Sequence, residues 1–173
     1  MTSMVKRPAV VLIGVVAIGF VVSGCGKLAL PSSPRTGVES IRFLRYQDNT
    51  LGPHCIEKMI KADKGRKLKL NMYSIKIPKN ALSNDTEISM CEPWPGIAVI
   101  DLGPEGLVFN KAVEFKISYK RLDLGDMNEE DLTIYFVDYE TNTWIDTHAK
   151  VDTKKKTVTA QIDHFSRYAL SDH

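Results

Sequence analysis

The sequence predicts an all-β domain, an antiparallel β-sandwich. Hydrophobic residues alternate with polar ones at period two, as at Val113, Phe115, Ile117 and Tyr119, which is typical of a strand with one face on a core and one in water. Turn residues interrupt these runs at short intervals, and no run has the period of an amphipathic helix of ordinary length. Many short strands without helical crossovers indicate an antiparallel sandwich or a partly open barrel, and we expect the sandwich.

The expected elements follow the chain in order. Leu132–Val137 is apolar on both faces and predicts a central strand. Turn residues at 140–142 and 152–156 predict a meander of hairpins in the last third. His54–Ala62 and Met127–Asp131 can each make one or two helical turns. The expected strands are Ile41–Tyr46, Lys67–Leu70, Met72–Ile77, Glu87–Cys91, Ile97–Leu102, Val113–Tyr119, Leu132–Asp138, Thr143–Thr147 with a continuation to Val151, and Thr157–Asp163.

Composition limits the class of protein. The chain has 173 residues, of which 43% are hydrophobic and 25% charged, which fits one globular domain. Without Lys6 and Arg7 at the N-terminus, the 23 basic residues become 21, equal to the 21 acidic residues. This balance argues against nucleic acid as a partner. Three cysteines are too few for a disulfide scaffold and wrongly spaced for a zinc ribbon.

Residues 1–24 have the pattern of an export signal, with Lys6 and Arg7 as its positively charged start. Ala9–Val22 is an uninterrupted apolar run of 14 residues. As a helix it would span about 21 Å, short of the ~30 Å core that a transmembrane helix must cross. The run ends in Val22–Cys25, Val-Ser-Gly-Cys, which resembles the bacterial lipobox. The resemblance implies cleavage between Gly24 and Cys25 and acylation of the Cys25 thiol, so that fatty acyl chains anchor the protein in the lipid bilayer.

Residues in and next to the signal peptide indicate which membrane holds the protein and whether the peptide is cleaved. Gly26 follows the acylated cysteine in place of the Asp that tends to hold enterobacterial lipoproteins in the inner membrane. We therefore expect an anchor in the outer membrane, facing the periplasm, if the host has one. The alternative is an uncleaved signal anchor extended by Pro8 and Gly24.

Export changes the interpretation of the other two cysteines. With Cys25 acylated, Cys55 and Cys91 are an even pair in an oxidising compartment. A Cys55–Cys91 disulfide is therefore the economical hypothesis, and two buried thiols are the alternative.

We divide the chain into three parts. Residues 1–24 are the signal peptide. Residues 25–38 are the acylated cysteine and a flexible tether, because this stretch is rich in Pro, Ser and Gly. Residues 39–173 are the β-sandwich domain.

Residues 75–88, 103–113 and 163–170 form three ordered blocks, and the first contains Ile-Pro-Lys-Asn-Ala-Leu at 77–82. These blocks resemble the ZU-five domain of zonula occludens, ankyrin and netrin-receptor proteins, which usually has Ile-Pro-x-Gly-Ala-Leu in the first block. The resemblance covers about residues 65–170 and implies an interaction domain, with an envelope protein of unknown identity as partner.

Two turns follow from residue types within these blocks. Pro78 is expected to end a strand because it has no N–H, and Asn80, in place of the family's glycine, to adopt the left-handed conformation. Gly103 and Gly106 flank Pro104, which suits a type II-like turn with Pro104 at its second position.

The tripeptide His164-Phe165-Ser166 is a candidate site of self-cleavage. In some ZU-five relatives it resembles a self-cleavage site, where the serine hydroxyl attacks the preceding carbonyl and the histidine accepts the proton. Cleavage between Phe165 and Ser166 would release only the eight residues Ser166–His173. We therefore expect Phe165 in the core, His164 and Ser166 on the opposite face, and no enzymatic activity.

Other polar residues suggest no catalytic or metal centre, and we expect no metal or cofactor. The four histidines (His54, His148, His164 and His173) lie far from one another in the sequence. Residues 138–142 superficially resemble a calcium loop but lack its glycine and final glutamate, so we expect a hairpin turn.

Charge is unevenly distributed along the chain. One cluster is acidic and another, between Glu57 and Lys69, is basic. Either cluster can be a solvated loop, whereas the basic one can also face anionic lipid headgroups or an acidic partner. The acidic cluster comprises Asp123, Asp126, Glu129, Glu130 and Asp131. The basic cluster between Glu57 and Lys69 comprises Lys58, Lys61, Lys64, Arg66, Lys67 and Lys69.

These features predict a membrane-anchored envelope lipoprotein whose β-sandwich domain acts as a binding or structural module. The rival function is a self-processing domain that uses His164 and Ser166. An envelope hydrolase without a recognised motif is the third class.

Overall fold

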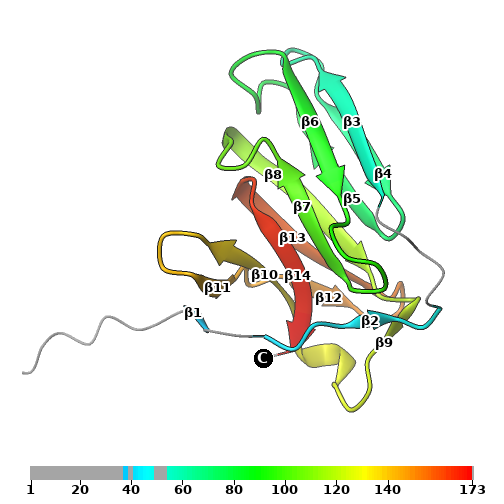
Figure 1. The fold of residues 1–173 in the computed structure, drawn as a ribbon. Helices are drawn as coiled ribbons and strands as arrows, with labels where there is room; N and C mark the ends of the chain where they lie inside the picture. The colour runs from blue at the N-terminus through cyan, green and yellow to red at the C-terminus, as the bar shows by residue number, and fades with distance from the viewer. Residues whose placement is uncertain (1–36, 39–40, 49–53, 173) are drawn as a thin grey trace, which may run out of the picture. The chain divides into compact units, whose positions relative to one another are not determined.

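Two antiparallel β-sheets dominate the structure (Figure 1). The structure is a computed structural model and describes residues 37–38, 41–48 and 54–172. A seven-stranded sheet has the order β1-β11-β10-β14-β7-β6-β3, and a five-stranded sheet has the order β12-β13-β8-β5-β4. The prediction of an all-β antiparallel sandwich is confirmed. The expected signal-peptide helix and nearly all of the tether lie outside the described residues.

The strands of the seven-stranded sheet are β1 (Gly37–Val38), β3 (Cys55–Ile60), β6 (Thr86–Cys91), β7 (Val99–Gly103), β10 (Leu132–Asp138), β11 (Thr143–Asp146) and β14 (Arg167–Asp172). Those of the five-stranded sheet are β4 (Arg66–Leu70), β5 (Tyr73–Ile77), β8 (Val108–Ser118), β12 (Lys150–Asp152) and β13 (Thr157–His164). A small separate sheet pairs β2 (Arg45–Tyr46) with β9 (Leu122–Asp123). A one-turn 3-10 helix, η1 (Glu129–Asp131), precedes β10 and confirms the helical turn predicted there.

The core lies between the two large sheets and follows from the period-two pattern. In β8, Val113, Phe115 and Ile117 are fully buried, whereas the alternate side chains are partly exposed. The opposite sheet contributes buried residues such as Ile88 of β6 and Tyr168 of β14 to the same cluster. The five-stranded sheet thus keeps one face on the core and leaves the other for polar side chains. In the seven-stranded sheet the inner strands β10 and β14 are buried on both faces, and Val99, Tyr135, Trp144 and Ala169 form a second, smaller hydrophobic cluster.

The prediction of helical turns at His54–Ala62 is wrong, because Cys55–Ile60 forms strand β3. This strand lies at the edge of its sheet, and only Ile60 is fully buried, so its sequence shows little alternation. Pairing with β6, in register from Cys55 opposite Cys91 to Ile60 opposite Thr86, supplies the backbone partners that decide its conformation.

The predicted meander in the last third is wrong in its connectivity. The hairpin β10–β11 belongs to the seven-stranded sheet, and the hairpin β12–β13 belongs to the other. The chain crosses between the sheets after Asp146 and returns at Phe165 and Ser166. Local hydrophobic patterns cannot distinguish these crossings from hairpin turns, because the strands on either side look alike.

The two turns predicted from residue types have different outcomes. β5 ends before Pro78, and Asn80 has a φ of 60°, as predicted. At the second turn, the N–H of Leu107 donates to the carbonyl of Pro104, 3.1 Å away. Pro104 is therefore the first residue of that turn and not the second, and Gly106, with a φ of 71°, is the third.

Candidate functional site

Several predicted site residues lie outside the part of the chain that the structure describes. These are the acylation site Cys25, the cleavage position Gly24, and the C-terminal His173. The described candidates are the tripeptide 164–166, the cysteine pair and the charged outer faces of the sheets.

The tripeptide 164–166 forms the corner at which the chain passes from β13 to β14. Phe165 is fully buried, as predicted, and packs edge-to-face against Phe109 with ring centroids 4.8 Å apart. Its N–H donates to the carbonyl of Leu107, and its carbonyl accepts from the N–H of Gly106, both at 2.9 Å. The loop before β8 therefore satisfies the backbone of this buried corner.

The two polar side chains of the corner have separate partners. The Ser166 hydroxyl is buried and donates to the carbonyl of Val137 on β10, at 2.7 Å. The His164 ring contacts Phe136 and lies with Nδ1 2.7 Å from Asp163, a hydrogen bond that lowers the pKa of the Asp163 carboxyl. The hydroxyl thus serves to hold the corner against β10.

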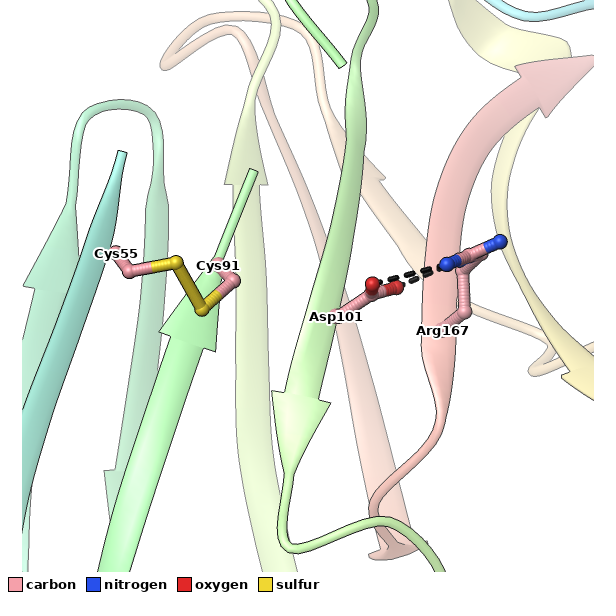
Figure 2. The surroundings of a disulfide bond; sticks show 4 residues. All are labelled: Cys55, Cys91, Asp101 and Arg167. Atoms are coloured by element: carbon pink, nitrogen blue, oxygen red, sulfur yellow. Dashed lines mark hydrogen bonds and ion pairs between the residues drawn. A yellow bond between two sulfur atoms is a disulfide. The ribbon is translucent and has the colours of Figure 1, made fainter. Parts of the chain in front are cut away.

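Cys55 and Cys91 form a disulfide between β3 and β6 (Figure 2). The two residues are directly opposite each other in the sheet register, with Cα atoms 4.1 Å apart. This short separation is typical of the closer of the two pairings in an antiparallel ladder. The bond ties the start of edge strand β3 to its neighbour.

The disulfide lies in one row with an ion pair on the outer face of the sheet. The register places Cys91 opposite Asp101 and Asp101 opposite Arg167, across β6, β7 and β14 (Figure 2). Arg167 donates through Nε and Nη2 to the two carboxylate oxygens of Asp101, at 2.6 and 2.9 Å. This pairing raises the pKa of Arg167, whose guanidinium also lies over the Trp94 ring. The disulfide therefore links β3 to β6, and the ion pair links β7 to β14.

Sequence reasoning missed a buried carboxylate. Glu92 directly follows β6 and is 3% exposed, and it accepts hydrogen bonds from the Tyr46 hydroxyl and the Asn71 side-chain amide. The hydroxyl of nearby Tyr73 is buried without a hydrogen-bond partner in the described structure. Burial raises the pKa of both tyrosines. A single glutamate after a strand carries no signal in the sequence, so only the fold shows its burial.

The basic residues predicted as a cluster between Glu57 and Lys69 are distributed over β3, the loop after it and β4. Lys61 lies in the loop after β3 and pairs with Asp85 at 2.5 Å. Lys67 and Lys69 lie on β4, where they face outward from the five-stranded sheet. The acidic cluster is partly neutralised, since Asp126 pairs with Arg42 and Glu129 pairs with Lys156.

Within residues 37–38, 41–48 and 54–172, no group of three or more His, Cys, Asp or Glu side chains is arranged to hold a metal ion. In the same residues, no helix is long and apolar enough to cross a membrane. The sequence matches no protein-family model and no curated protein.

Proposed function

We propose that this chain is an envelope lipoprotein, anchored by acyl chains on Cys25, whose β-sandwich domain acts as a binding or structural module. We infer the anchor from three features that occur in the required order. They are the basic residues Lys6 and Arg7, the apolar run of residues 9–22 and the Val-Ser-Gly-Cys sequence of residues 22–25. A module with the ZU-five pattern is the expected form of the domain, and its partner would be an envelope protein.

The observation that carries this proposal is the disulfide between Cys55 and Cys91. Structural disulfides form and persist mainly outside the cytosol, in compartments where thiols are not kept reduced. The leader predicts export on independent grounds, so two separate features support the same compartment. Only the third cysteine, Cys25, is then left for acylation.

Metabolic labelling with a radioactive fatty acid tests the anchor. The wild-type chain should take up label and enter the membrane fraction, whereas Cys25→Ser should remain unlabelled and keep its leader. The double variant Cys55→Ser/Cys91→Ser is the matched control, since it also loses cysteines but should be labelled normally. Normal labelling of Cys25→Ser, or no labelling of the wild-type chain, would refute the proposal.

A further inference from the structure

A hollow of about 460 Å³ lies on the outer face of the five-stranded sheet. We call it the basic hollow and define it by its five cationic lining residues. Strands β4, β5, β8 and β13 and the segment between β8 and β9 contribute to its walls. Its volume is in the range of small-molecule sites. The five are Lys67, Lys69, Lys116, Lys120 and Arg121.

The sheet register explains why these charges gather. Leu68 of β4 faces the core, so Lys67 and Lys69 on either side of it face outward. Lys69 is opposite Ser74 of β5, and Ser74 is opposite Lys116 of β8, so a serine lies between two lysines across three strands. Neighbouring strands are about 4.8 Å apart, which separates the Lys69 and Lys116 backbones by about 10 Å.

The positive charge of the basic hollow is largely uncompensated. Within the described residues, Lys67, Lys69 and Lys120 have no ion pair, and no acidic side chain lines the hollow. The other two cations have exposed partners outside it, Glu114 for Lys116 at 3.6 Å and Asp48 for Arg121 at 2.6 Å. A concave surface with one sign of charge attracts a ligand of the other sign.

One end of the basic hollow is held in place before any ligand arrives. Tyr46 and Asn71 line it, and both donate hydrogen bonds to the buried carboxylate of Glu92. The hydroxyls of Ser74 and Thr157 also line the hollow and make no side-chain hydrogen bond among the described residues. These hydroxyls are free to donate to an incoming anion.

We propose that the basic hollow binds a free, multiply phosphorylated anion. Four of its five cations are lysines, which bind phosphate as point charges, and the fifth, Arg121, can bind a phosphate group through two parallel N–H donors. A polyphosphate carries more negative charge than a small carboxylate and so gains more from five cations. Hydroxyl donors such as Ser74 are common partners of phosphate oxygens. Cations spaced over about 10 Å suit several phosphate groups, and a hollow suits a discrete ligand better than the flat surface of a bilayer. The site does not depend on acylation of Cys25.

Isothermal titration calorimetry with sodium tripolyphosphate tests this proposal on the full chain in a non-ionic detergent at low ionic strength. We expect saturable binding of one tripolyphosphate per chain that weakens as salt is added. Lys69→Gln and Lys116→Gln should each weaken binding about tenfold, the usual value of a charge-assisted contact. The control variant Lys58→Gln/Lys154→Gln removes two exposed lysines that do not line the hollow, and should bind like the wild type.

Four outcomes would contradict the proposal, and the fourth concerns citrate. One is no saturable binding by a wild-type chain with a normal thermal unfolding transition. Another is equal weakening in the control variant, which would indicate nonspecific attraction. The third is binding to phosphatidylglycerol vesicles that requires Lys69 and Lys116 while tripolyphosphate does not bind, which would assign the surface to a membrane. Trisodium citrate should bind more weakly than tripolyphosphate, and equal binding would contradict the preference for phosphate.

Discussion

The Tyr46 hydroxyl donates a hydrogen bond to the carboxylate of Glu92, a residue that is 3% exposed. Asn71, in the turn between β4 and β5, donates to the other carboxylate oxygen. The contact joins the N-terminal segment that contains β2 to the segment after β6. A carboxylate buried to this degree is costly unless donors replace its water, so both donors matter to the fold.

Replacing Tyr46 by Phe should lower the free energy of unfolding by about 2 kcal/mol, because the buried Glu92 carboxylate loses a donor that water cannot replace. Tyr119→Phe is the matched control. Tyr119 donates to Glu129, whose side chain is 33% exposed, and water can substitute there. Its loss should cost less than about 1 kcal/mol. Chemical denaturation measures the free energy of unfolding of both variants. Equal losses would show that burial of Glu92 does not strengthen its hydrogen bond to Tyr46.

Removing the disulfide should destabilise the domain without changing its fold. The bond joins residues 36 apart in sequence, for which chain-entropy reasoning gives about 4 kcal/mol. We expect Cys55→Ser/Cys91→Ser to unfold at a lower denaturant concentration than the oxidised wild type. Reductant should lower the unfolding midpoint of the wild type to that of the double variant, and should leave the midpoint of the double variant unchanged. A wild type insensitive to reductant would contradict a stabilising disulfide.

Ser166→Ala should cost about 1 kcal/mol of stability, since it removes the hydrogen bond to the Val137 carbonyl. Intact mass of the wild type should correspond to a chain that ends at His173, because the Ser166 hydroxyl is engaged with β10. A chain that ends at Phe165 in the wild type, and at His173 in Ser166→Ala, would instead demonstrate self-cleavage.

Phe165→Ala tests how much the packing of the buried ring stabilises the same corner. Phe165 is fully buried and lies edge-to-face against Phe109. Its truncation should cost about 3–5 kcal/mol, as for other large core residues. The neighbouring His164→Ala should cost much less, since the imidazole is partly exposed. Thermal unfolding compares the two, and a similar loss in both would contradict the role of Phe165 as the core residue of the corner.

Stability should fall in acid through three carboxyls at the ends of strands or next to them, Asp85, Asp138 and Asp152. Hydrogen bonds from the Lys61 side chain to Asp85, from Thr141 to Asp138 and from the Lys155 N–H to Asp152 lower their pKa values below 3.8. Since the folded pKa lies below the unfolded one, their contribution is complete above about pH 4 and is lost as pH falls through the folded values.

The triple variant Asp85→Asn/Asp138→Asn/Asp152→Asn tests this, because Asn keeps a hydrogen-bond acceptor but does not titrate. We expect it to be less stable than the wild type at pH 7 and to lose less stability between pH 5 and pH 2. Thermal unfolding across this range measures the difference. Parallel pH profiles for the two proteins would show that other groups dominate the acid response.

Local residue types determined much of the fold. Alternation in β8 and β13 predicted both strands and their buried faces, because side chains on successive strand residues point to opposite sides. Pro78 and Asn80 predicted their turn, because one lacks an N–H and the other tolerates positive φ. The parity of the cysteines predicted the Cys55–Cys91 pair. Each of these inferences depends on interactions within a few residues or on counting.

Only the tertiary structure decided the rest. Strand β3 forms because β6 supplies its hydrogen bonds, and its own sequence shows little alternation. The buried position of Glu92 and the gathering of Lys69 with Lys116 depend on segments far apart in the chain. Which of the two sheets a strand joins depends on pairing between distant segments. Hydrophobic periodicity describes one strand at a time and carries no information about its neighbours.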